Sequence, residues 1–91
     1  MMSGNTYLGG GMNVAGSKVP AAVLHDVVAH MRSQAFTSAQ LQEVALASLR
    51  VHGGPITTCM VVGERMLEKH RRSGLIHRVV PGRVPVWAWV G

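Results

Sequence analysis

The chain has 91 residues, a net charge of +5 and one cysteine, Cys59. A chain of this length forms one small domain with a modest core. A single cysteine excludes an internal disulfide and favours a reducing compartment. The sequence has neither the roughly 18 apolar residues that a membrane span needs nor the charged start and apolar run of a signal peptide. We therefore expect a cytoplasmic protein, and its basic balance favours an anionic partner.

Residues 1–17 hold five of the eleven glycines, including Gly9-Gly10-Gly11. Glycine runs lose much conformational entropy when they become ordered. We therefore expect a flexible N-terminal arm over residues 1–17, which Tyr7 and Leu8 could dock locally, and one folded domain over residues 18–91.

The first predicted helix covers about Pro20–Ser33. Proline is tolerated in the first turn of a helix, where its missing N–H does no harm. Apolar residues then repeat every three or four positions and form one stripe, which consists of Leu24, Val27, Val28 and Met31.

The second predicted helix, Ser38–Arg50, has the strongest local signal. Thr37 is a good N-cap, and Gln40 three positions later completes a capping box. Phe36 before the cap can pack on Leu41 as a hydrophobic staple. A His52-Gly53-Gly54-Pro55 break ends the segment and permits a sharp turn.

A third helix is predicted over Ile56–Ser73, with Thr57 or Thr58 as its N-cap and Gly74 as its stop. The segment is amphipathic. Its inner face gathers Cys59, Val62, Gly63, Met66, Leu67 and His70. Its outer face gathers Thr57, Thr58, Val61, Glu64, Arg65, Glu68, Lys69 and Arg72. Glycine inside a helix costs about 1 kcal/mol against alanine, so Gly63 on the inner face predicts the close approach of another helix.

Beyond this helix the pattern changes to a β-hairpin. Leu75–Val80 and Val84–Val90 are rich in β-branched residues and flank a Pro81-Gly82-Arg83 turn. Alternate side chains of the second strand are apolar on both faces, so one face should cover the helices and the other is a second packing surface or an exposed patch. Pro85 favours an edge strand. The predicted fold class is α+β, three helices followed by a C-terminal hairpin.

From Phe36 onward the sequence resembles the winged helix-turn-helix superfamily of bacterial and phage DNA-binding proteins. Phe36-Thr37-Ser38-Ala39-Gln40-Leu41 is similar to the short first strand and second helix of that superfamily. Met66-Leu67-Glu68-Lys69, followed by Ser73-Gly74-Leu75-Ile76, is similar to the end of a recognition helix entering the wing. The resemblance implies a winged-helix domain over residues 18–91, with helix 56–73 in the major groove and the hairpin 75–90 as a wing against the backbone. It further implies a small transcriptional regulator that binds double-stranded DNA.

The charge is concentrated in the same segment. Six of the nine Lys and Arg residues lie within residues 56–83, where only Glu64 and Glu68 oppose them. Arg65 could donate hydrogen bonds to a guanine edge, and Val61 could contact a thymine methyl group. Thr57 and Thr58 could form hydrogen bonds with bases or phosphates. The candidates for phosphate contacts are Lys69, Arg71, Arg72, Arg78 and Arg83. The alternative for all of them is a solvated, basic surface.

Trp87 and Trp89 stand two apart on one strand face, so they belong either to the core or to an interface. The interface could be the seam of a homodimer or a site for a protein partner. A second function is thus open: a winged-helix interaction module that does not bind DNA, either an assembly subunit or a phage inhibitor of a host nucleoprotein complex. We expect no cofactor and no metal, because no histidine pair has helical ligand spacing and Cys59 lacks a second thiol. We expect no enzyme, since the sequence shows no paired acid, phosphate loop or nucleophile elbow.

Overall fold

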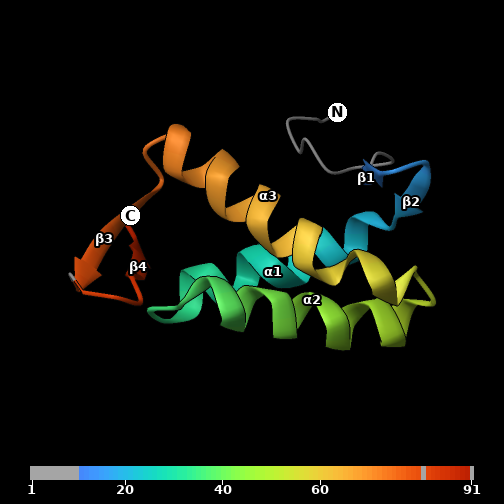
Figure 1. The fold of residues 1–91 in the computed structure, drawn as a ribbon, viewed down its shortest axis with the longest axis horizontal. Helices are drawn as coiled ribbons and strands as arrows, with labels where there is room; N and C mark the ends of the chain where they lie inside the picture. Colours follow the sequence, from blue (N-terminus) through green and yellow to red (C-terminus); the bar gives the residue numbers. More distant parts are fainter. Residues whose placement is uncertain (1–10, 81, 91) are drawn as a thin grey trace.

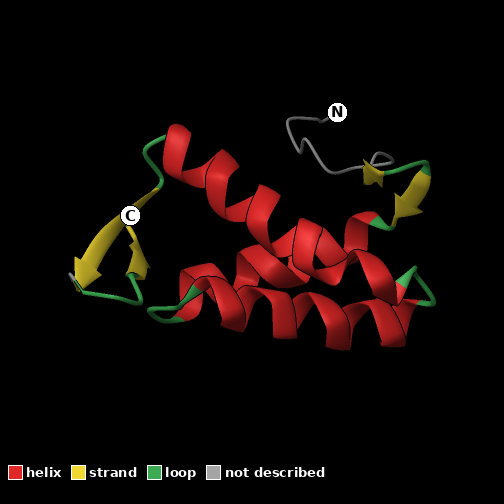
Figure 2. Cartoon of the chain, viewed as in Figure 1, coloured by secondary structure: helices red, strands yellow, loops and turns green. Residues whose placement is uncertain are grey.

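The computed structural model describes residues 11–80 and 82–90, and it packs three helices together between two β-hairpins (Figure 1). The predicted class, three helices followed by a C-terminal hairpin, is confirmed (Figure 2). In chain order the elements are β1 (Met12–Val14), β2 (Ser17–Val19), α1 (Ala21–Ser33), α2 (Ser38–His52), the 3-10 turn η1 (Ile56–Thr58), α3 (Cys59–Arg72), β3 (Ile76–Val80) and β4 (Val86–Trp89).

An N-terminal hairpin stands where a flexible arm is predicted. Residues 1–10 lie outside the described residues, but the prediction is wrong for residues 12–17, and the expected domain boundary at residue 18 falls inside β2. Val14 pairs with Ser17 across Ala15 and Gly16, whose φ angles of 49° and 84° suit a two-residue mirror-image turn. The buried Val14 and Val19 belong to the core, so burial of two valines outweighs the cost of ordering glycine.

The first two helices match their predictions closely. α1 begins one residue later than expected, with Pro20 as its N-cap, and α2 continues two residues further, to His52. Both halves of the capping box are present at the start of α2, since the Gln40 N–H donates to Thr37 Oγ1 at 3.2 Å and the Thr37 N–H to Gln40 Oε1 at 2.9 Å. Gly53 ends α2 in the left-handed conformation with φ 75°.

The third helix lies close against α2. A Cβ atom added at Gly63 would lie 2.7 Å from Gln42 Cγ and 3.0 Å from its backbone nitrogen, which confirms the close approach predicted there. The inner face is also as predicted, with Val62, Gly63, Met66 and His70 buried. The start of the helix differs, because the first three residues form η1 and the α-helix proper begins at Cys59.

β3 and β4 form the C-terminal hairpin, which is antiparallel with a bulge between Arg78 and Val80. Both strands are shorter than predicted, since Leu75 and Val84 lie outside them, and Pro81 of the expected turn lies outside the described residues. Phe36 pairs with Trp87 on the other side of β4, and the two residues exchange both backbone hydrogen bonds, at 2.9 and 2.8 Å. The hairpin is thereby attached to the α1–α2 junction.

The core is aliphatic around one phenylalanine. Leu24 and Met31 of α1, Leu49 of α2 and Met66 of α3 meet Phe36 in a single buried cluster, and Ile76 extends it to the C-terminal hairpin. None of the described helices has the length and apolar character needed to cross a membrane.

Candidate nucleic-acid interface

The exposed side of α3 carries a shallow basic hollow of about 360 Å³. It is lined by Arg65, Glu68, Lys69, Arg72 and Ser73, and we call it the α3 hollow. Its residues come from the last two turns of the helix and the residue that follows, where cations also interact favourably with the helix dipole. The hollow therefore presents three cations and one carboxylate on a single surface.

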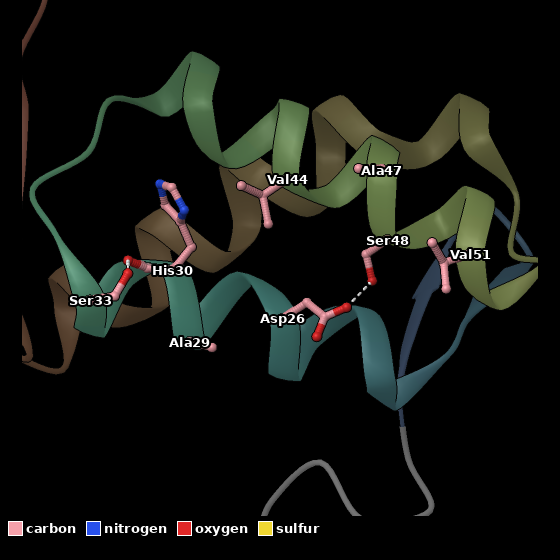
Figure 3. A pocket seen from close by; sticks show the side chains of 8 residues that line it. All are labelled: Asp26, Ala29, His30, Ser33, Val44, Ala47, Ser48 and Val51. Atoms are coloured by element: carbon pink, nitrogen blue, oxygen red, sulfur yellow. Dashed lines mark hydrogen bonds between the residues drawn. The ribbon is translucent and has the colours of Figure 1, made fainter.

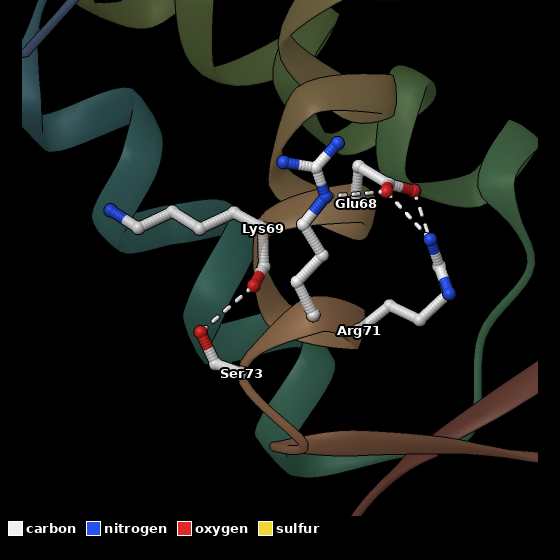
Figure 4. Close-up of polar contacts among 5 residues, drawn as sticks. Glu68, Lys69, Arg71 and Ser73 are labelled. Atoms are coloured by element: carbon white, nitrogen blue, oxygen red, sulfur yellow. Dashed lines mark hydrogen bonds and ion pairs between the residues drawn. The ribbon is translucent and has the colours of Figure 1, made fainter.

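Glu68 holds two of the arginines. Arg71 donates to both carboxylate oxygens, at 3.1 and 2.6 Å, and Arg72 Nε donates to one of them at 2.8 Å (Figure 4). The hydrogen bonds from Arg71 and then Arg72 lower the pKa of Glu68, and the same contact raises the pKa of Arg71. All three side chains are partly exposed, so the cluster adds little to folding stability. Its main effect is to reduce the charge that Arg71 and Arg72 offer to an anion.

The Arg65 side chain is hydrogen-bonded within the fold. Its guanidinium Nη1 donates to the backbone carbonyl of Asn13, at 2.7 Å, across 52 residues of sequence. The N-terminal hairpin thus engages one nitrogen of the exposed Arg65 guanidinium, and the assignment of this residue to a guanine edge stays a prediction. The sequence holds no signal for the contact with Asn13, since the acceptor is a main-chain atom in a segment without a recognisable pattern.

The three smaller side chains predicted to reach bases have different surroundings. Thr57 is exposed and stays a candidate. Thr58 is only 5% exposed, and its hydroxyl donates to the Pro55 carbonyl at 2.6 Å, so both the predicted base contact and a side-chain cap are wrong. Val61 is half-buried against the core. Thr57 is thus the small polar side chain left exposed at this end of the helix.

Lys69 and Ser73 complete the hollow. Lys69 is exposed and extends away from the Glu68 cluster, while the Ser73 hydroxyl donates to the Lys69 carbonyl at 3.0 Å (Figure 4). Arg78 and Arg83 do not line the hollow but lie on the C-terminal hairpin, both exposed, and Arg78 donates to the Gly82 carbonyl at 3.2 Å. The predicted phosphate contacts therefore fall into two groups, one on α3 and one on the hairpin.

The tryptophans lie between core and surface. Both are partly buried and pack on the core. The Trp89 ring lies 5.9 Å from the ring of His70, centroid to centroid, and the Arg32 guanidinium lies over it at 5.5 Å. Of the two predicted locations, the structure favours packing against the helices for this ring. A role of Trp87 and Trp89 in a seam stays a prediction.

A larger groove of about 590 Å³ lies on another surface, between α1 and α2 (Figure 3). Asp26 in this groove accepts a hydrogen bond from Ser48 at 2.6 Å and lies 3.5 Å from His52. His30 also lines it, and its Nε2 is buried without a partner in the described part of the chain. The groove was not foreseen from the sequence, because its residues share no spacing motif. It has no arginine or lysine in its lining and does not suit nucleic acid.

Comparison of the chain with family models, with curated proteins and with solved structures gives no significant match in any of the three.

Proposed function

We propose that the chain is a small regulator of transcription that binds double-stranded DNA, with α3 against the duplex and the C-terminal hairpin beside it. The observation that carries this proposal is the α3 hollow, which places Arg65, Lys69 and Arg72 on the exposed side of one helix. Clusters of cations on one helix face are the usual electrostatic footprint of a nucleic-acid site.

The order of the elements supports the same proposal. α2 leads through a short break into α3, and the C-terminal hairpin follows directly. The backbone bridge between Phe36 and Trp87 also lies where the winged-helix resemblance implies a short strand before α2. In such an arrangement one helix enters a groove while the hairpin contacts the flanking backbone.

Binding of this kind would depend mainly on phosphate contacts. Arg65 is held by Asn13, and Glu68 faces the duplex among the cations, so few side chains are left to read base edges. Phosphate contacts fix the register of a protein on DNA and carry the salt dependence, without selecting a sequence. We therefore propose modest sequence preference, which a homodimer with two such helices would increase.

The test is a titration of a random duplex at several salt concentrations. Neutralising about four to six phosphates would give a slope of log affinity against log salt near −4 to −5. Arg72→Gln should make the slope shallower by about 1, because it removes one phosphate contact.

Arg50→Gln is the matched control, since it makes the same charge change at an exposed position of α2 outside the hollow. It should leave the slope nearly unchanged. Equal effects of the two substitutions would show that net charge alone governs binding, and no binding at low salt would overturn the proposal.

A further inference from the structure

β3 is an open edge of the C-terminal sheet. It pairs with β4 alone in the described part of the chain, while the other side of β4 is occupied by Phe36. Figure 1 shows β3 as the outer strand, farther from the helices than β4. An exposed edge presents unpaired backbone groups to any extended chain that can reach it.

The ladder shows which backbone groups point to that edge. Trp87 directs both its N–H and its carbonyl to Phe36, away from β3. Arg78, which faces Trp87 across the ladder, therefore belongs to a non-hydrogen-bonded pair. Its backbone N–H and carbonyl point away from β4, toward the open edge of β3. By the alternation of an antiparallel ladder those of Ile76 point the same way, but Ile76 is only 4% exposed, so Arg78 is the exposed position of the two.

The hairpin also has an uncovered apolar surface. Cross-strand partners share a face, so Ile76 and the tryptophans face the helices. The opposite face, which we call the outer face, carries His77 among the apolar residues Leu75, Val80, Val86, Ala88 and Val90. Leu75 is 41%, Val80 49% and Val90 57% exposed. An apolar face beside an open edge is typical of a site that an added strand covers.

The charges around the edge indicate which chain would add there. No aspartate or glutamate lies between Glu68 and Gly91 in the sequence, whereas Arg78 lies in the middle of β3 and Arg83 in the following loop. Two copies paired through β3 about its centre would bring Arg78 beside Arg78, and opposed like charges destabilise a strand pair. Charge complementarity therefore disfavours a second copy of this chain and favours an acidic strand.

We propose that β3 binds an extended segment of a protein partner in which acidic and apolar residues alternate. The segment adds as a strand beside β3 and pairs with the outward backbone groups of Arg78. Its acidic side chains lie on the face that carries Arg78, and its apolar side chains continue the outer face. This interaction goes beyond DNA binding and does not depend on it, because it uses the free edge of the hairpin and not α3.

The probe is a fluorescein-labelled peptide of about eight residues that alternates valine and glutamate, compared with the valine–lysine peptide. We expect the acidic peptide to raise the fluorescence anisotropy and the basic one not to. Amide exchange by NMR should slow at Arg78 in the complex, because its outward N–H becomes bonded. A valine–glutamate peptide with alternate N-methyl groups should fail to bind, since it lacks the donors of one edge.

Arg78→Glu should weaken binding of the acidic peptide by about fivefold or more, because the cross-strand charge pair is reversed. The same substitution should let the basic peptide bind. Arg72→Gln on α3 should leave peptide binding unchanged while it weakens binding of duplex DNA. This difference separates the strand proposal from the proposed function. Equal binding of both peptides, or protection on α3 instead of β3, would overturn it. So would protection of the Arg78 amide without peptide at a concentration where the protein sediments as a dimer.

Discussion

Glu68 shows how a single residue can set the strength of a basic site. It is the one carboxylate in the lining of the α3 hollow, and it binds both Arg71 and Arg72. A carboxylate near DNA phosphates is repelled, and it also engages donors that the phosphates would otherwise take. Arg72 lies four residues after Glu68 and donates one hydrogen bond, whereas Arg71, three residues after it, makes the bidentate contact.

We expect Glu68→Gln to tighten duplex binding at neutral pH and to steepen the salt slope, because it removes one negative charge and releases two arginines. Glu64→Gln is the control: Glu64 is exposed on the same helix and makes no ion pair within the described residues. It should strengthen binding less, although the net charge changes equally. A larger effect at Glu64 would contradict the role given to Glu68.

The lowered pKa of Glu68 determines how its contribution to folding stability changes with pH. Its small stabilising contribution is present above the ordinary value of 4.5 and is lost as pH falls through the lower folded-state pKa. In Glu68→Gln the unfolding free energy should therefore lose this part of its acid dependence, as urea unfolding at acid and neutral pH would measure.

At the scale of elements, the helices could be predicted because their signals are local. Thr37 and Gln40 fix the start of α2 through bonds within one turn, and Gly53 ends it. The N-terminal hairpin could not, since its stability comes from burying Val14 and Val19 against distant residues. The Arg65–Asn13 bond is likewise set by packing across 52 residues, which no spacing rule describes. The candidate site was thus predicted as a set of cations, but not in its contacts.

We expect Gly63→Ala to destabilise the fold by about 1–3 kcal/mol, because the added methyl would press on the Gln42 backbone and push α2 from α3. The gain in helix propensity, about 1 kcal/mol, acts in the opposite direction. Chemical unfolding followed by circular dichroism measures the net change. Glu64→Ala, at the exposed neighbouring position, should cost less than about 0.5 kcal/mol. Stability of Gly63→Ala at or above that of the wild type would show that the helices can separate at little cost.

For the whole molecule, the contact between Arg65 and Asn13 joins the N-terminal hairpin to the proposed interface. We expect Arg65→Ala to cost about 1 kcal/mol of stability and to speed amide exchange in β1 and β2. Its effect on duplexes should be the same for every sequence, because the side chain is engaged within the fold. Arg83→Ala, at an exposed loop position, should weaken duplex binding without changing exchange in the N-terminal hairpin. A loss of sequence preference in Arg65→Ala would show instead that the arginine leaves Asn13 to read a base.

The position of Trp87 and Trp89 in β4 gives the protein an intrinsic fluorescent reporter of the C-terminal hairpin. The two tryptophans of the chain both lie in β4, and this strand is bonded to the α1–α2 junction on one side and to β3 on the other. Indole emission therefore follows the environment of the C-terminal hairpin, whereas far-ultraviolet ellipticity follows the three helices. Unfolding curves recorded by the two signals compare the opening of the hairpin with the melting of the helical bundle, without any label attached.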